Sequence, residues 1–249
     1  MTETDNDAPE APEIGLYGDA AAEAASGLGL PSLRVLQAAG AIQSRKMSKY
    51  HGGFRRMWPE QDVLRASLAA AFTGHFGWNG RTAAEVLAKA HAATWGALIE
   101  TSTAGLAGAD VAARPLVTAG QRDWHVVLVD RKFLFIEIPI EATTILPDTI
   151  FGQTTLLLGL VGREAFTPIP WAFGSDAGIA RMQAIFEPAA FKKAGRAYKV
   201  AMAAHGNFLS KATINASLQA RFCWHQLHGQ EARLVQDAVN IETKGDANQ

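Results

Sequence analysis

The stretch His51-Gly52-Gly53-Phe54-Arg55-Arg56 lies inside the region from Gly18 to Leu87 that decides how the front half of this chain folds. Between Ala24 and Pro59 there is no Asp or Glu, and the basic residues are Arg34, Arg45, Lys46, Lys49, Arg55 and Arg56. Elsewhere the two signs are mixed. An all-positive window between helical patterns is typical of a surface that meets phosphate groups. A solvated basic loop has the same composition, so the order of the neighbouring elements must decide between the two.

The residues before and within this window have the pattern of a helix-turn-helix. Gly18 to Ala25 is rich in Ala and predicts a short helix. The segment 26–30 then contains two glycines, which allow a tight turn. Pro31 suits the first position of a second helix, and apolar residues recur at helical spacing as far as Gly40, which is placed to end it. Two helices joined by a glycine-containing turn form the outline of a helix-turn-helix unit.

A hairpin and further helices are predicted after these two helices. Gly52-Gly53 suits a hairpin tip, and we expect Phe54 and Trp58 to pin that hairpin to the core of the domain. The run 59–62, Pro-Glu-Gln-Asp, has a proline and acidic residues where the first turn of a helix favours them. A further helix is predicted over 82–106. A core helix and a dimer helix both fit it, because its apolar stripe lacks a sustained heptad with charged flanks.

The order of these residues resembles the N-terminal winged-helix domain of MerR-type transcriptional regulators. The resemblance covers residues 16 to 90 and is carried by four runs: Gly27-Leu28-Gly29-Leu30-Pro31-Ser32-Leu33-Arg34, Ala39-Gly40-Ala41-Ile42, Gly52-Gly53-Phe54-Arg55-Arg56 and Glu60-Gln61-Asp62-Val63-Leu64. One arginine and both tyrosines usual in the family's recognition helix are missing from the run 31–37. The resemblance implies a recognition helix in the major groove, a wing on the flanking backbone and a dimer formed through the helix 82–106.

The expected DNA-binding residues lie on the second helix and on the wing: Ser32, Arg34, Arg45, Lys46, Lys49, Gly53, Arg55 and Arg56. We expect Arg34 to meet a phosphate, since most protein–DNA hydrogen bonds go to the backbone. Neighbouring side chains of a strand point to opposite faces, so only one of Arg55 and Arg56 should meet DNA while the other braces the wing. The prediction is a sequence-specific DNA-binding transcriptional regulator that acts as a homodimer on double-stranded DNA, with an unknown small-molecule effector possible.

The second half predicts an α+β module. The runs 124–129 and 133–138 form the clearest hairpin pattern, with three polar or charged residues between two apolar strands. Residues 154–161 fit a strand or a buried helix equally well. Helices are predicted over 175–186, after Pro188 and over 207–228. In the helix after Pro188 four cations form a second basic face, read as solvated: Lys192, Lys193, Arg196 and Lys199.

The predicted fold class is mainly α with a small β component, and the chain is divided into five segments. They are a disordered acidic tail (1–15), a winged helix-turn-helix domain (16–81), a connecting or dimerisation helix (82–106), an α+β effector or interaction module (120–235) and a flexible tail (236–249). The acidic tail is predicted because residues 1–13 hold five of the 24 acidic residues and no basic one.

Composition predicts a water-soluble, cytoplasmic protein. Hydrophobic residues make up 48% of the 249 residues and charged residues 19%, which is ordinary for a globular chain. The single cysteine, Cys223, excludes an intramolecular disulfide and indicates a reducing compartment. The first residues lack the pattern of a secretory signal. The most apolar stretch, 143–161, is interrupted by Pro147, Asp148 and Gln153, so we expect no membrane partner.

No catalytic or metal-binding pattern is found, so we expect no enzyme, no cofactor and no metal. The chain lacks a Gly-x-Ser-x-Gly elbow, a His-Glu-x-x-His motif, a Walker loop and a dinucleotide fingerprint. Cys223, His225 and His228 are close in sequence, but zinc needs four tetrahedral ligands. Two other functions stay open: an α+β enzyme or small-molecule-binding protein with an incidental winged-helix-like domain, and a phage or mobile-element protein for DNA packaging or interaction.

Overall fold

The computed structural model describes residues 15–48, 54–90, 92–104, 106, 123–139, 155–162, 165–169, 180 and 187–229. Several predicted segments lie outside these residues: the two tails, the linker at 107–120 and, except for residue 180, the helix at 175–186. Of the expected DNA-binding residues, Lys49 and Gly53 also lie outside. Within the described residues the fold is α+β.

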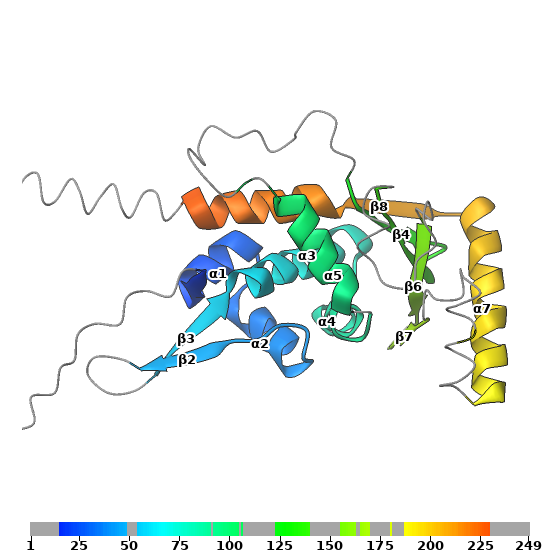
Figure 1. The fold of residues 1–249 in the computed structure, drawn as a ribbon, viewed down its shortest axis with the longest axis horizontal. Helices are drawn as coiled ribbons and strands as arrows, with labels where there is room; N and C mark the ends of the chain where they lie inside the picture. The colour runs from blue at the N-terminus through cyan, green and yellow to red at the C-terminus, as the bar shows by residue number, and fades with distance from the viewer. Residues whose placement is uncertain are drawn as a thin grey trace, which may run out of the picture.

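The front half combines helices with a three-stranded antiparallel sheet of order β1-β3-β2. Its elements are β1 (Leu16–Gly18), α1 (Asp19–Ser26), α2 (Leu30–Ala38), β2 (Arg45–Ser48), β3 (Phe54–Pro59), α3 (Glu60–Phe76), α4 (Gly80–Lys89) and α5 (Ala92–Thr103). Strand β1 pairs Tyr17 with Trp58, and β2 pairs Lys46 with Arg56. Figure 1 shows the β2–β3 hairpin projecting from the helical body at one end of the molecule. The order helix, turn, helix and projecting hairpin is that of a winged helix-turn-helix.

The second half is built on a five-stranded antiparallel sheet of order β7-β6-β5-β4-β8. Its elements are β4 (His125–Val129), β5 (Phe133–Glu137), β6 (Thr155–Val161), β7 (Phe166–Pro168), α7 (Pro188–Gly206) and β8 (Lys211–Asn215), followed by a helix at 216–229. The almost unbroken apolar sequence of β4, β5 and β6 agrees with their burial. Helix α7 stands at the far end of the molecule from the β2–β3 hairpin (Figure 1).

One continuous hydrophobic core joins the two halves. The cluster of buried side chains runs from Tyr17 to Leu227 without a break between the winged helix and the sheet. The helix 216–229 carries much of this connection, since its Cys223 thiol lies 3.8 Å from the Val63 carbonyl oxygen of α3 and its Ser217 hydroxyl is 2.8 Å from that of Ser102 on α5. The sequence predicts a domain boundary between 106 and 120. Among the described residues the hydrophobic core continues from one side of this region to the other, so the packing does not divide the chain there.

The local signals of the front half are confirmed by the structure. Gly27 takes a left-handed conformation (φ 73°) and ends α1, and Pro31 lies in the first turn of α2. Gly40, with φ 76°, follows α2, and the Ala41 N–H donates to the Leu36 carbonyl oxygen.

In the second half, the predicted hairpin of residues 124–138 is formed by β4 and β5. The run at 154–161, which fitted a strand or a buried helix, contains strand β6.

The single helix predicted over 82–106 is wrong, because two helices occupy this stretch. Ala90 has an extended conformation (ψ 152°) and ends α4, and α5 begins at Ala92. Both helices pack on α3, where Val86, Trp95 and Leu98 are fully buried. Because the chain turns back between α4 and α5, apolar residues on several sides of these helices become buried. One straight helix over the same stretch would leave part of these residues in water. The face expected to form a dimer is thus covered within one chain.

The helix predicted over 207–228 is also wrong in its first part. Lys211–Asn215 form the strand β8, which pairs antiparallel with β4 and places Thr213 opposite Val127. Without β8, the backbone N–H and C=O groups on that side of β4 would lack partners. Helix begins only at residue 216.

Candidate nucleic-acid interface

The turn between α1 and α2 is held by side chain to backbone hydrogen bonds. The Leu28 N–H donates to the Ser26 hydroxyl (3.3 Å), and the Leu30 N–H donates to the carboxylate of Glu23. The Glu23 carboxylate also lies at the N-terminus of α2, where the helix dipole favours negative charge. These bonds fix the angle at which α2 leaves α1.

Helix α2 has one buried face and one exposed face. Leu33 and Leu36 are 1% exposed and pack into the core. The opposite face is exposed. It consists of Pro31 and the residues three, four and seven positions after it, which are Arg34, Val35 and Ala38. Ser32 is half-buried at the edge between the faces. Helix α2 therefore exposes an arginine to solvent, and Figure 1 shows this helix next to strand β2 of the hairpin.

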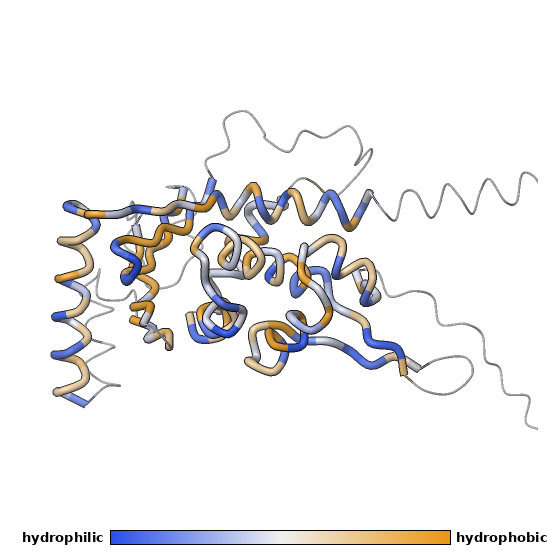
Figure 2. Tube along the Cα trace, turned by 180° about the vertical axis from the view of Figure 1, so that it is seen from behind, coloured by the Kyte–Doolittle hydropathy of each residue, from blue (hydrophilic) through white to orange (hydrophobic). Residues whose placement is uncertain are grey.

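The hairpin exposes cations on both of its strands. Arg45 and Lys46 on β2 are exposed, as is Arg55 on β3, and Arg56 is half-buried. In Figure 2 the hydrophilic colour is concentrated along this hairpin, in contrast to the apolar strands of the second half. The predicted basic residues that the structure describes thus lie together on the wing and the neighbouring α2.

The two arginines at the centre of β3 lie on different faces, as predicted. The Arg56 guanidinium lies over the Trp58 ring, 5.7 Å from its centroid, and so braces the wing. The Arg55 guanidinium lies over Gly18, where a Cβ would come within 2.6 Å of Nη2. Arg55 is nevertheless exposed, whereas Arg56 is half-buried, so Arg55 is the arginine of β3 that is open to solvent.

Of the two aromatic residues expected to anchor the hairpin, only Trp58 does so. Trp58 is 1% exposed, and its indole N–H donates to the Asp19 carboxylate at 2.7 Å. Phe54 is 72% exposed, so the expectation that it packs on the core is wrong. It is the first residue of β3, four residues before Trp58, and the β2–β3 hairpin projects from the helical body (Figure 1).

Three described carboxylates on the elements around this surface are held by contacts within the fold. Asp19 accepts from Trp58, Glu23 accepts from Leu30, and Glu60 accepts from the Tyr17 hydroxyl at 3.3 Å and lies 3.1 Å from the His228 imidazole. In contrast, Arg34 and Arg55 form no ion pair with any described carboxylate. At Arg34 and Arg55 the positive charge is therefore not neutralised by a described carboxylate.

No protein-family model, no curated protein and no solved structure matches this chain. A function for this chain therefore has to be inferred from the geometry of α2 and the wing. Among the helices of the described residues, none combines the length and the apolar character needed to span a membrane.

Three exposed residues were not among the predicted contacts. Pro31, Val35 (44% exposed) and Ala38 complete the solvent-facing side of α2 around Arg34. Their spacing in the sequence is visible, but which side of a short helix faces outward depends on what its other side packs against. An exposed valine on such a helix can contact the methyl group of thymine.

The described part of the chain contains no group of three or more His, Cys, Asp and Glu side chains that could hold a metal ion. His228 stacks on Trp224, with ring centroids 4.0 Å apart, and lies beside Glu60. Cys223 is fully buried among apolar residues. These contacts make the histidine and the cysteine part of the packing between the last helix and α3.

Burial should make the single cysteine unreactive. Desolvation raises the pKa of the Cys223 thiol to about 12, and only the thiolate attacks a disulfide reagent. We expect the folded protein not to react with dithionitrobenzoate at pH 8. In urea the unfolded protein should release one equivalent of thiolate from the reagent. The absorbance of this thiolate measures both reactions. Rapid release from the native protein would contradict the placement of Cys223 against α3.

Proposed function

We propose that this chain is a sequence-specific regulator that binds double-stranded DNA with α2 in the major groove and the β2–β3 wing on the flanking backbone. The observation that carries the proposal is the combination of an exposed helix face that carries Arg34 with a protruding hairpin that exposes Arg55, neither of which forms an ion pair with a described carboxylate. Helix insertion with a flanking backbone contact is a general mode of duplex recognition. The resemblance to MerR-type regulators over residues 16–90 supports the same function.

In this proposal the side chains have different roles. Arg34 and Arg55 contact phosphates and set the position of the protein on the duplex, while Val35 faces the floor of the major groove. Arg45 and Lys46 add positive charge that steers the approach. Arg56 acts indirectly, because its place over Trp58 keeps the wing in position.

A dimer on a pseudo-palindromic site extends this proposal. One winged helix covers too few base pairs for tight specificity, so two copies are expected to bind two half-sites. The dimer contact has to come from a surface other than the buried faces of α4 and α5.

The double substitution Arg34→Ala and Arg55→Ala tests the proposal. Each neutralised phosphate contributes about 0.9 to the slope of log affinity against log salt, so the variant should bind duplex DNA more weakly and with a slope lower by about 2. Fluorescence anisotropy of a labelled duplex, selected from random sequences, measures both quantities. Because both side chains are exposed, the melting temperature should stay unchanged.

A matched control removes two cations from the other basic surface. Lys192 and Lys199 are exposed on α7, at the far end of the molecule from the wing (Figure 1). Replacing both by Ala should leave duplex affinity and salt slope as in the unaltered protein. If the α7 variant loses the greater affinity, or if random-sequence selection enriches no motif, the proposed interface or the proposed regulator function is wrong.

A further inference from the structure

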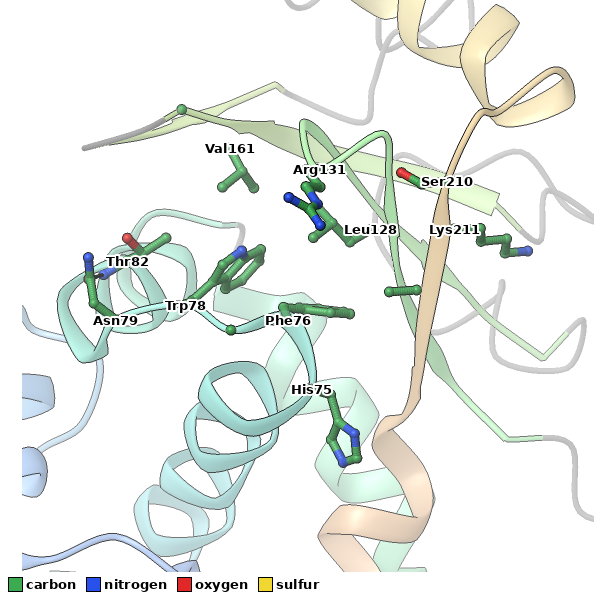
Figure 3. A pocket seen from close by; sticks show the side chains of 13 residues that line it. His75, Phe76, Trp78, Asn79, Thr82, Leu128, Arg131, Val161, Ser210 and Lys211 are labelled. Atoms are coloured by element: carbon green, nitrogen blue, oxygen red, sulfur yellow. Dashed lines mark hydrogen bonds between the residues drawn. The ribbon is translucent and has the colours of Figure 1, made fainter.

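A cavity of about 680 Å³ lies between the winged helix and the second sheet. One wall is the end of α3 and the start of α4, with His75, Phe76, Trp78 and Asn79. The opposite wall comes from the sheet, where Arg131 in the β4–β5 turn and residues of β6 and β8 face it. Figure 3 shows the side chains of Arg131 and Trp78 entering the cavity from opposite sides. Its volume is in the range of sites that hold small molecules.

The described residues that line this cavity include three basic side chains, His75, Arg131 and Lys211, and no Asp or Glu. One of the three, Lys211, is neutralised by Glu137, with Nζ 3.2 Å from the carboxylate oxygen. Arg131 has no ion pair or hydrogen bond with the side chain of any described residue. The N-terminus of α4 also lies at the cavity, since its capping residue Asn79 lines it. The cavity therefore favours an anion.

The backbone of Arg131 is held in an unfavourable conformation. Asp130 (φ 50°) and Arg131 (φ 55°) occupy the two central positions of a tight hairpin turn closed by the Lys132 N–H and the Val129 carbonyl oxygen, 3.0 Å apart. Asp130 tolerates this conformation, and its carboxylate accepts from the backbone N–H groups of Leu209 and Ser210, both at 2.8 Å. For Arg131 no side-chain hydrogen bond or ion pair with a described residue explains why the position is not glycine, the residue such turns favour.

The opposite wall presents flat aromatic rings. Phe76 and Trp78 pack against each other with centroids 4.9 Å apart, and both also contact Phe72 of the core. Both remain partly exposed on the cavity side. Among the described residues the cation–π contacts of arginine and lysine involve Trp58, Phe133 and Phe208, and none joins Arg131 to Trp78. The ring face and the guanidinium are therefore both available to a third group.

We propose that this cavity binds a small organic anion with a flat apolar ring, whose carboxylate pairs with Arg131 and whose ring packs on Trp78. A planar guanidinium suits a carboxylate because it donates two parallel hydrogen bonds. The unfavourable conformation of Arg131 is retained because it directs this guanidinium into the cavity. The site is distinct from α2 and the wing, and the proposal does not depend on DNA binding.

Calorimetric titration of the full chain with four probes tests the proposal. The probes are 2-naphthoate, which has ring and charge, 2-naphthamide, which has the ring alone, cyclohexanecarboxylate, which has charge without a flat ring, and inorganic phosphate. 2-Naphthoate should bind most tightly, and 2-naphthamide about ten- to a hundredfold more weakly, as expected for the loss of a charged hydrogen bond. Equal binding of naphthoate and naphthamide, or no binding of naphthoate, would overturn the proposal.

The substitution Arg131→Gly separates binding from folding. Glycine accepts the left-handed conformation, so the variant should melt at the same or a higher temperature while naphthoate affinity falls to that of the amide. Lys132→Gln is the matched control, because Lys132 belongs to the same turn, lies over Phe133 and does not line the cavity. It should bind naphthoate as the unaltered chain does. Unchanged naphthoate affinity in Arg131→Gly, or an equal loss in Lys132→Gln, would show that the anion binds elsewhere.

Discussion

Replacing Arg221 by Met is expected to lower the free energy of unfolding by about 3–5 kcal/mol, the loss typical when one partner of a buried ion pair is removed. Arg221 is 2% exposed, and its Nη2 lies 2.9 and 3.0 Å from the two carboxylate oxygens of Asp123. Methionine fills part of the space but leaves the Asp123 carboxylate with the Asn215 amide, at 2.6 Å, as its remaining side-chain partner among the described residues. An unpaired charge at a site only 15% exposed is strongly unfavourable.

The position of this ion pair explains why its loss should affect the whole molecule. Asp123 stands just before β4, and Asn215 ends β8 and accepts from the Leu218 N–H, thereby capping the helix 216–229. The pair thus holds the edge of the sheet to the helix that packs on α3. A total stability of about 5–15 kcal/mol is usual for a folded chain, so the expected loss is a large part of it.

Urea unfolding followed by circular dichroism measures this loss, with a double variant as its control. Replacing Arg221 by Met together with Asp123 by Asn removes both charges and should regain more than half of the stability lost in the single variant. If the single variant unfolds within about 1 kcal/mol of the unaltered protein, the pair does not have the role that its burial suggests.

Replacing Trp95 by Ala is expected to cost about 3–5 kcal/mol, as for other large aromatic residues truncated in a core. Trp95 on α5 is fully buried, and its ring centroid lies 6.0 Å from that of Phe72 on α3. The cavity left by alanine would lie between α5 and α3, which pack against each other and against α4. Because the contact is within one chain, the loss should be the same at every protein concentration.

Trp95→Phe is the matched control for this position. The Trp95 indole N–H is buried without a hydrogen-bond partner among the described residues, so phenylalanine removes an unsatisfied donor as well as some apolar area. The loss of apolar area lowers the free energy of unfolding, whereas the removal of the unsatisfied donor raises it. The net loss of free energy of unfolding should stay below about 1.5 kcal/mol. Unfolding by urea measures both variants. A loss that shrinks as protein concentration rises would instead place Trp95 in a contact between chains.

The elements that were predicted correctly have signals within a few residues of one another. Gly27 and Gly40 end α1 and α2 because each adopts a positive φ that other residues disfavour, and Pro59 precedes the acidic first turn of α3. The two apolar runs of β4 and β5 on either side of a short turn are equally local. The basic residues of the candidate interface could be identified for the same reason, since a run without acids is visible in the sequence alone.

The elements that were missed depend on partners far away in the chain. β1 has three residues and exists because it pairs with β3, and β8 exists because β4 offers an unpaired edge about 85 residues earlier. The break between α4 and α5 reflects the shape of α3, on which both pack. In the same way, the exposure of Phe54 follows from the projection of the hairpin beyond the core, and the bare sequence has no sign of that.

The sequence by itself determined the helix-turn-helix, the wing with its arginines and the central hairpin of the second sheet, because glycine, proline, short apolar runs and charge act over short distances. Only the tertiary structure decided that the two halves share one core, that Arg55 faces solvent while Arg56 lies on Trp58, and that Arg131 and Trp78 line the same cavity. These features arise where segments distant in sequence pack together, and burial and pairing there outweigh local preference.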